Sequence, residues 1–192
     1  MSVSTSPILV LIGLRLSGKS TLGSIVAAHL QCEFVDLDNA VLQKLGATNV
    51  RQTFHDMGEA AWRDAERVEL TRLLAAKLCG VLSLGGGAPT APGVADILQA
   101  AKARGDIFIA LLDPGECELA TRLTNNRGDR PLLNAANASG DAAADATAEV
   151  RALCASRMPL YRTLANVIVD TKESEHACAK TLLAAFASAR AR

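Results

Sequence analysis

The chain has 192 residues, of which 49% are hydrophobic and 21% are charged, a composition typical of a folded globular protein. Lys plus Arg and Asp plus Glu number 20 each, so no net charge favours nucleic acid or an anionic membrane as a partner. No apolar run approaches the roughly 18 residues of a membrane span, and no basic segment precedes the first apolar run. The five cysteines are widely spaced without a CxxC pair, which favours reduced, mostly buried thiols. We therefore expect one cytoplasmic domain with neither membrane nor nucleic acid as a partner.

Short apolar runs alternate with helical patterns along the chain. Strands are expected at residues 8–13, 32–38, 80–87, 106–112 and 166–171. Helices are expected at residues 18–30, 39–45, 59–78, 92–103, 115–123 and 174–190. The 59–78 helix should turn Val68, Leu70, Leu73 and Leu74 inward. This alternation favours an α/β fold in which a five-stranded parallel sheet lies between two layers of helices. The Ala-rich stretch 134–147 predicts a mobile loop rather than a linker between domains.

The segment "GLRLSGKST" follows the first predicted strand and opens the first predicted helix. It matches the phosphate-binding pattern GxxxxGK[ST] at Gly13, Gly18, Lys19 and Ser20. In such a loop, backbone N–H groups and the helix N-terminus surround phosphate oxygens. The lysine reaches the β- and γ-phosphates, and the serine hydroxyl binds Mg²⁺. No Asn-Lys-x-Asp guanine-recognition motif occurs, and the chain is too short for a motor ATPase, so a small kinase is the remaining interpretation.

Two carboxylates end the second predicted strand, in "FVDLD". Because alternate residues of a strand share a face, Asp36 and Asp38 should point to one side, beside the phosphate loop. One could support Mg²⁺, and the other could accept a hydrogen bond from the acceptor hydroxyl. The triplet Gly85-Gly86-Gly87 ends the third predicted strand, where glycines allow backbone N–H groups to approach a ligand.

Three arginines lie at positions that suit anion recognition. They are Arg63 in "GEAAWRDAE", Arg130 in "NNRGDRPLL" and Arg157 in "SRMPLY". A guanidinium group binds carboxylate or phosphate through two hydrogen bonds at once. Spacing and charge alone leave open whether such arginines would bind a carboxylate or a phosphate monoester.

The motifs "FVDLD", "GEAAWRDAE", "LSLGGGAPT", "RPLL" and "RMPLYRTLANVIVDT" follow the phosphate loop in that order. Together they resemble the shikimate kinase family over roughly residues 7–172. The resemblance implies a fold of the P-loop nucleoside monophosphate kinase type. It also implies transfer of the ATP γ-phosphate to the 3-hydroxyl of shikimate, with Mg²⁺, in aromatic amino acid biosynthesis. It further implies a substrate-binding segment at about residues 37–65 and a mobile lid at about residues 125–147.

The resemblance also implies a role for each matched residue. ATP would be bound by Arg130 and by the phosphate loop, which comprises Gly13, Leu14, Arg15, Leu16, Ser17, Gly18, Lys19, Ser20 and Thr21. Mg²⁺ would be held by Ser20, with Asp36 as support. Shikimate would be bound by Asp38, Arg63, Gly85, Gly86, Gly87 and Arg157. Lys19, Asp38 and Arg130 would act in catalysis, and Glu66 could hold Arg63 in position.

The chain departs from the family pattern at Leu16, where the family's loop usually carries a further glycine, and at Leu42, where the family often has glutamate. The segment after Arg130 is also longer and richer in alanine than expected. Two alternatives stay open at this point: a related kinase for gluconate or a nucleoside monophosphate, and a kinase-like module that binds a ligand without catalysis. Nothing in the sequence demands a partner surface, so we expect a monomer.

Overall fold

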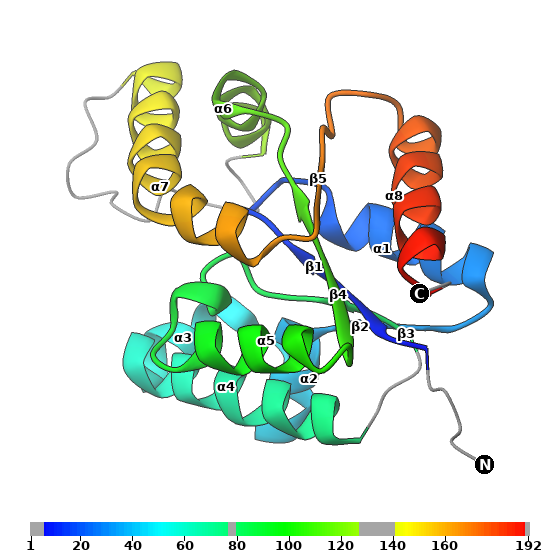
Figure 1. Ribbon diagram of the computed structural model, residues 1–192. Coiled ribbons are helices and arrows are strands. Elements are labelled where there is room, and N and C mark those ends of the chain that lie inside the picture. Colours follow the sequence, from blue (N-terminus) through cyan, green and yellow to red (C-terminus); the bar gives the residue numbers. More distant parts are fainter. Residues whose placement is uncertain (1–5, 77–79, 127–140, 191–192) are drawn as a thin grey trace, which may run out of the picture.

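The computed structural model describes residues 6–76, 80–126 and 141–190 (Figure 1). Its centre is a parallel sheet whose strands run in the order β2-β3-β1-β4-β5. The strands are β1 (Ile8–Ile12), β2 (Glu33–Asp36), β3 (Gly80–Ser83), β4 (Ile107–Leu112) and β5 (Val167–Val169). The predicted fold class, a five-stranded parallel sheet within an α/β protein, is confirmed.

Helices cover both faces of the sheet. One face carries α1 (Lys19–Leu30) and α8 (Glu175–Arg190). The hydrophobic cluster of the other face includes residues of α2 (Leu37–Leu45), α4 (Glu59–Ala75), α5 (Val94–Ala103), α6 (Glu116–Asn125), α7 (Ala142–Leu164) and the 3₁₀ turn η1 (Ala88–Thr90), with α3 (Val50–Met57) packed against it. In Figure 1, α2 to α5 lie together below the sheet, and α6 and α7 lie above them.

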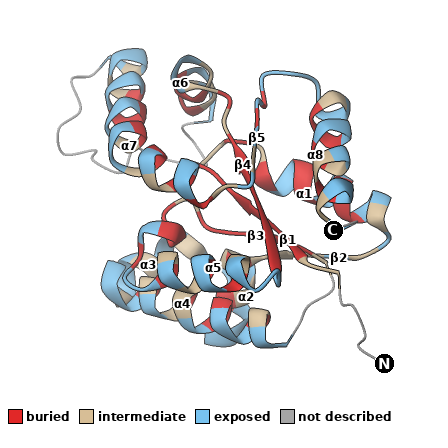
Figure 2. Cartoon of the chain, viewed as in Figure 1, coloured by how far each residue is buried: buried red, intermediate tan, exposed pale blue. Residues whose placement is uncertain are grey.

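The central strand β1 is apolar throughout because both of its faces are buried. Leu9 and Leu11 pack into the cluster of α1 and α8, whereas Val10 and Ile12 pack into the opposite cluster. A strand buried on both faces reads as a continuous apolar run instead of an alternating one. Figure 2 shows this central sheet as the buried interior of the molecule.

The second strand is shorter than predicted. It ends at Asp36, whose carboxylate accepts hydrogen bonds from the backbone N–H groups of Asp38 and Asn39 and so caps α2. Asp38 therefore lies in the first turn of α2, and the expectation that both carboxylates share one face of a strand is wrong. Because Asp36 caps α2, the strand ends there and the following residues are helical.

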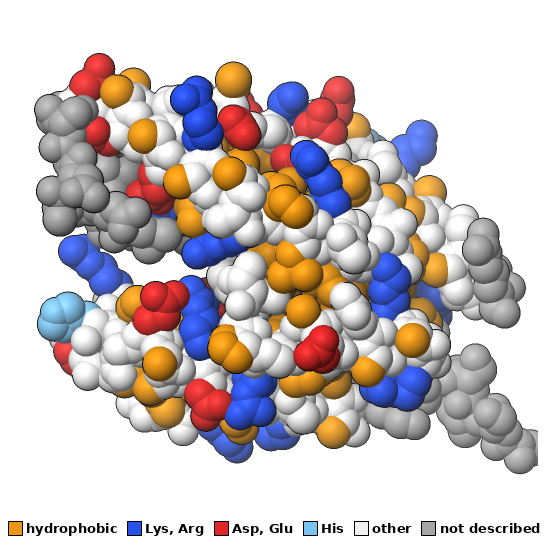
Figure 3. Space-filling model, turned by 60° about the vertical axis from the view of Figure 1, so that its left-hand side comes forward, with side chains coloured by type: hydrophobic (Ala, Val, Ile, Leu, Met, Phe, Trp, Pro, Cys, Tyr) orange, Lys and Arg blue, Asp and Glu red, His pale blue; other side chains and the backbone are white. Residues whose placement is uncertain are grey.

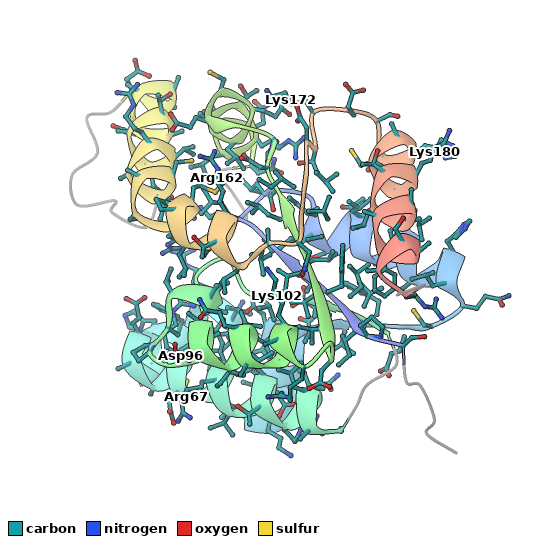
Figure 4. The ribbon with its side chains drawn as sticks, in the orientation of Figure 1. Arg67, Asp96, Lys102, Arg162, Lys172 and Lys180 are labelled. Atoms are coloured by element: carbon teal, nitrogen blue, oxygen red, sulfur yellow. The ribbon has the colours of Figure 1, made fainter. Side chains whose placement is uncertain are left out.

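Helix α7 is the largest element that the sequence pattern did not predict. Residues 142–147, expected to be part of a loop, form its first turns after the N-cap Asp141. At its other end, Lys102 of α5 donates to the carbonyl groups of Leu164 and Ala165 (Figure 4). Helix α3 was also missed. Arg130, Cys79 and most of the predicted lid lie outside the described residues.

The expected burial of residues in the 59–78 helix and of the cysteines is met only in part. Leu70 and Leu73 are buried and Leu74 is partly buried, but Val68 is 53% exposed. Of the four cysteines in the described residues, Cys154 and Cys178 are buried and Cys117 is exposed. Within the described ranges, no helix is both long and apolar enough to cross a membrane.

Candidate active site

The phosphate loop joins the central strand β1 to α1 at the carboxyl edge of the sheet. Gly18 caps α1 with φ 94°, a conformation that favours glycine. The Lys19 side chain is only 9% exposed, and its Nζ lies 2.9 Å from the Gly13 carbonyl oxygen and 2.8 Å from that of Leu14. The ammonium group thus lies within the loop that would surround a phosphate.

Leu16 occupies the loop position at which the sequence departs from the family. Its φ is 64°, in the left-handed region that non-glycine residues rarely adopt. The backbone has therefore kept a conformation suited to glycine, while the side chain packs against the hydrophobic cluster of the α7 face. Arg122 of α6 donates to the Leu16 carbonyl at 3.0 Å and holds this strained residue in place.

Further contacts brace the loop from outside. Arg122 also donates to the Thr171 carbonyl at 2.7 Å, and the Thr171 hydroxyl donates to the Ser17 carbonyl at 2.9 Å. Arg15 of the loop also forms an ion pair with Glu149 of α7. The sequence pattern did not single out Arg122, Thr171 or Glu149, because they act on the loop from elements distant in the chain.

Ser20 and Asp36 meet beside this loop. The Ser20 hydroxyl donates to Asp36 Oδ2 at 3.2 Å, so a hydroxyl and a carboxylate are paired at the start of α1. Mg²⁺ prefers oxygen ligands and usually combines one or two protein oxygens with phosphate oxygens and water. The chemistry of this pair therefore fits a magnesium ion bound together with a nucleotide.

Asp38 and Glu66 bring two carboxyl groups to Gly85. A Cβ atom at Gly85 would lie 2.6 Å from Asp38 Oδ1 and 2.4 Å from Glu66 Oε1, so a larger residue there would displace both carboxyl groups. Burial, and then the negative charge of Asp36, raise the pKa of Asp38, although Lys19, Glu66 and Arg63 oppose the rise. Glu66 is 1% exposed, and burial raises its pKa to about 7.

Arg63 lies between two glutamates of its own helix. Its Nη1 is 2.7 Å from Glu66 Oε2, and its Nη2 is 3.4 Å from Glu59 Oε1. The guanidinium group also lies over the Phe54 ring, 5.8 Å from its centroid. At Gly87, a Cβ atom would lie 2.4 Å from Arg63 Nη2. Glu66 thus holds Arg63, as the resemblance implied, and aims it at the glycine turn.

Arg157 reaches the same turn from α7. Its Nη1 donates to the Gly86 carbonyl at 2.9 Å, and the Tyr161 hydroxyl donates to the same oxygen at 2.7 Å. Gly86 in turn lies against the phosphate loop, because a Cβ atom there would be 2.9 Å from the Arg15 backbone nitrogen. The structure therefore brings Asp38, Arg63 and Arg157 to one glycine turn beside the phosphate loop.

A hollow opens in Figure 3 between the half of the molecule that carries α7 and the half that carries α3 and α4. Lys and Arg side chains stand on its walls. Trp62 is 2% exposed and belongs to the core, whereas Phe54 is only partly buried. Tyr161 and Glu59 are further residues near this site that sequence reasoning missed.

The sheet order, the phosphate loop and the acidic and basic groups facing it define a P-loop phosphotransferase. Comparison with known proteins gives the family: the model of the family "Shikimate kinase" matches residues 15–187. A shikimate kinase from Mycobacterium avium is 39% identical over 166 residues, which are 86% of this chain and 85% of that protein. The chain belongs to the shikimate kinase family.

Solved structures agree. Shikimate kinase from Acinetobacter baumannii in complex with shikimate matches with a TM-score of 0.80 and 29% identity, covering 98% of this chain and 97% of the other. A gluconokinase from Sinorhizobium meliloti matches with a TM-score of 0.57 and 16% identity, covering 97% of this chain and 94% of that one. The second likeness shows a shared fold and no more.

Proposed function

We propose that the residues around the glycine turn carry out the reaction of the shikimate kinase family in this protein. That reaction transfers the γ-phosphate of ATP to the 3-hydroxyl of shikimate and gives shikimate 3-phosphate and ADP. The observation that carries the proposal is the convergence of Asp38, Arg63 and Arg157 on residues 85–87, directly beside the phosphate loop. An acceptor with hydroxyl groups and one carboxylate suits these side chains, because arginine binds a carboxylate and aspartate accepts from a hydroxyl.

ATP would bind through the phosphate loop. The proposed contacts are Gly13, Leu14, Arg15, Leu16, Ser17, Gly18, Lys19, Ser20 and Thr21. Lys19 Nζ is bonded to the carbonyl groups of Gly13 and Leu14, and it would exchange these bonds for phosphate oxygens. The charge of the phosphates and the N-terminal end of α1 favour that exchange.

Ser20 and Asp36 are the proposed magnesium residues, Ser20 as a direct ligand and Asp36 as its support. When bound, the ion would neutralise charge on the phosphates during transfer. Asp36 would hold the Ser20 hydroxyl oriented, as its 3.2 Å contact already does.

Arg63 and Arg157 would hold the acceptor carboxylate, and the N–H groups of Gly85, Gly86 and Gly87 would line the same pocket. Asp38 would then accept a hydrogen bond from the 3-hydroxyl and receive its proton as the oxygen attacks the γ-phosphate. Because burial raises the pKa of Asp38, this carboxylate is a better proton acceptor than an exposed aspartate. Phosphoryl transfer leaves the protein mainly positioning and charge stabilisation to supply.

Several assignments stay predictions. Arg130 is proposed to approach ATP with the lid, and it lies outside the described residues. We also propose that the chain divides into a core, a substrate-binding segment at about 37–65 and a lid at about 125–147. A monomeric state in the cytoplasm, without nucleic acid or membrane partners, is likewise proposed, and light scattering of the purified protein tests the monomer.

The proposal is tested by measuring ADP release from MgATP with shikimate, gluconate, AMP or no acceptor. We expect turnover with shikimate, and only background ADP release with gluconate, with AMP and without an acceptor. Turnover with gluconate or AMP instead would assign the protein to a related kinase. Shikimate binding without any turnover would favour a ligand-binding module.

A further inference from the structure

Tyr161 is the only tyrosine of the chain, and it is fully buried at 0% exposure. It lies in the last turn of α7, and its hydroxyl donates to the Gly86 carbonyl at 2.7 Å. Burial raises the pKa of this phenol to about 12, so it remains a hydrogen-bond donor throughout the neutral range. Nothing in the reaction described above uses this group.

The carbonyl group that Tyr161 binds has a second donor. Arg157, one helical turn earlier on α7, donates to the same oxygen at 2.9 Å. A carbonyl oxygen has two lone pairs and can accept both bonds. Arg157 is also the side chain that is proposed to turn towards the carboxylate of the acceptor, so its bond to Gly86 competes with substrate binding.

The Gly86 carbonyl belongs to a turn on which the site depends. A Cβ atom at Gly86 would lie 2.9 Å from the Arg15 backbone nitrogen of the phosphate loop, and one at Gly87 would lie 2.4 Å from Arg63 Nη2. The turn therefore contacts the phosphate loop on one side and an acceptor arginine on the other. Rotation of the Gly86 peptide would disturb both.

We infer that Tyr161 is a positioning residue for the acceptor: its hydroxyl holds the Gly86 carbonyl so that Arg157 is free to bind the carboxylate of shikimate. A partly buried carbonyl such as that of Gly86 loses stability when it has no donor. With Tyr161 present, Arg157 can leave Gly86 without leaving that oxygen unpaired. Without the hydroxyl, Arg157 is the remaining donor to this oxygen among the residues that the structure describes, and it must divide its hydrogen bonds between Gly86 and the substrate. The inference rests on the proposed function.

The first test is Tyr161→Phe, which removes only the hydroxyl. We expect the KM for shikimate to rise about 10-fold, in line with the loss of one hydrogen bond, while kcat and the KM for ATP stay within about 2-fold. The matched control is Thr163→Val, which removes an exposed hydroxyl that donates to a carbonyl of the same helix, that of Pro159. The control should leave all three constants within about 2-fold of wild type.

A second test separates this role from general support of the fold. In Arg157→Lys, the side chain at 157 can no longer bind both the carbonyl and a carboxylate as a guanidinium does. Adding Tyr161→Phe to this variant should therefore raise the KM for shikimate by less than about 3-fold. Interacting residues give such non-additive effects, whereas a loss of packing elsewhere would add in full.

A third measurement needs no variant. Incorporating 3-fluorotyrosine labels one site, because the chain has one tyrosine. Its fluorine resonance should shift with shikimate, with a midpoint near the KM, and should not shift with gluconate. This readout stays valid even if Tyr161→Phe folds poorly.

The outcomes are distinguishable. If wild type has no shikimate-dependent turnover, the proposed function fails, and the inference fails with it. If wild type is active but Tyr161→Phe keeps its KM for shikimate, or raises the KM for ATP equally, the inference alone is overturned. Full additivity in the Arg157→Lys background, or an unresponsive fluorine resonance, would also contradict it.

Discussion

Leu16 shows at the scale of one residue how a sequence change can leave a backbone conformation intact. With φ at 64°, an L-amino acid carries strain of about 1–2 kcal/mol relative to glycine. Packing of the leucine side chain and the bond from Arg122 to its carbonyl offset this strain. The departure from the family therefore alters side-chain packing in the loop while its path is kept.

A matched pair of variants isolates the strain. Leu16→Ala and Leu16→Gly both remove the packing of leucine, but only glycine also removes the strain at positive φ. Part of the stability gained by removing the strain is offset, because glycine makes the unfolded chain more flexible. We expect Leu16→Gly to be more stable than Leu16→Ala by up to about 1 kcal/mol in urea unfolding. A more stable alanine variant would show that the left-handed conformation is not held.

Glu66 is the residue whose ionisation should couple most strongly to stability. Its pKa is raised from 4.5 to about 7, so the favourable contribution of its protonated form is complete below pH 4.5 and is lost as the pH rises through 7. Glu66→Gln keeps the shape and hydrogen bonds but cannot ionise. Relative to this variant, wild type should lose about 3 kcal/mol of unfolding free energy between pH 4.5 and 8.

Urea unfolding of both proteins across this pH range measures the difference directly. Glu69→Gln is a suitable control, because Arg72 lowers the pKa of Glu69 through a side-chain hydrogen bond. The difference in unfolding free energy between wild type and Glu69→Gln should therefore not fall as the pH rises through 7. If the difference in unfolding free energy between wild type and Glu66→Gln stays constant across this pH range, the Glu66 carboxyl group ionises as it does in water.

At the scale of elements, the junction of β2 and α2 combines a structural role and a proposed metal-supporting role in Asp36. Its carboxylate caps α2 and also accepts from Ser20. The motif "FVDLD" was enough to place Asp36 and Asp38 near the phosphate loop. It could not locate the strand end, because an aspartate within an apolar alternation reads equally well as a strand residue or as a helix cap.

Asparagine at position 36 separates the two roles, because asparagine caps helices about as well as aspartate does. Asp36→Asn should therefore keep stability within about 0.5 kcal/mol of wild type, while the Mg²⁺ concentration for half-maximal activity rises. Asp36→Ala should lose both functions, with about 1 kcal/mol of stability. The comparison needs urea unfolding and a Mg²⁺ titration of turnover. An unchanged Mg²⁺ requirement in Asp36→Asn would remove Asp36 from the metal site.

Helix α7 could not be predicted because its signals conflict. Its first turns are rich in alanine, which looked like a low-complexity loop, and Pro159 interrupts its later turns. Proline in a helix interior normally breaks it. Here Val150, Met158 and Tyr161 are buried against the core, and this packing keeps the helix continuous through the proline.

At the scale of the whole molecule, the five strands and the phosphate loop were predictable because each is encoded by a short stretch of chain. The site is harder to predict, since it joins residues from β1 to α7. Local motifs indicated Asp38, Arg63 and Arg157, but not the residues that brace the glycine turn and the phosphate loop beside them. Tyr161, Arg122 and Glu149 act through contacts that span 75, 106 and 134 residues of sequence.

The central claim is that Asp38, held beside the glycine turn, accepts the proton of the shikimate hydroxyl. Asp38→Asn keeps the size of the side chain and removes this capacity. We predict that its kcat with MgATP and shikimate falls by about 10²–10⁴-fold, while shikimate binding measured by calorimetry stays within a few-fold of wild type. A variant that binds shikimate and turns it over at the wild-type rate would contradict the account.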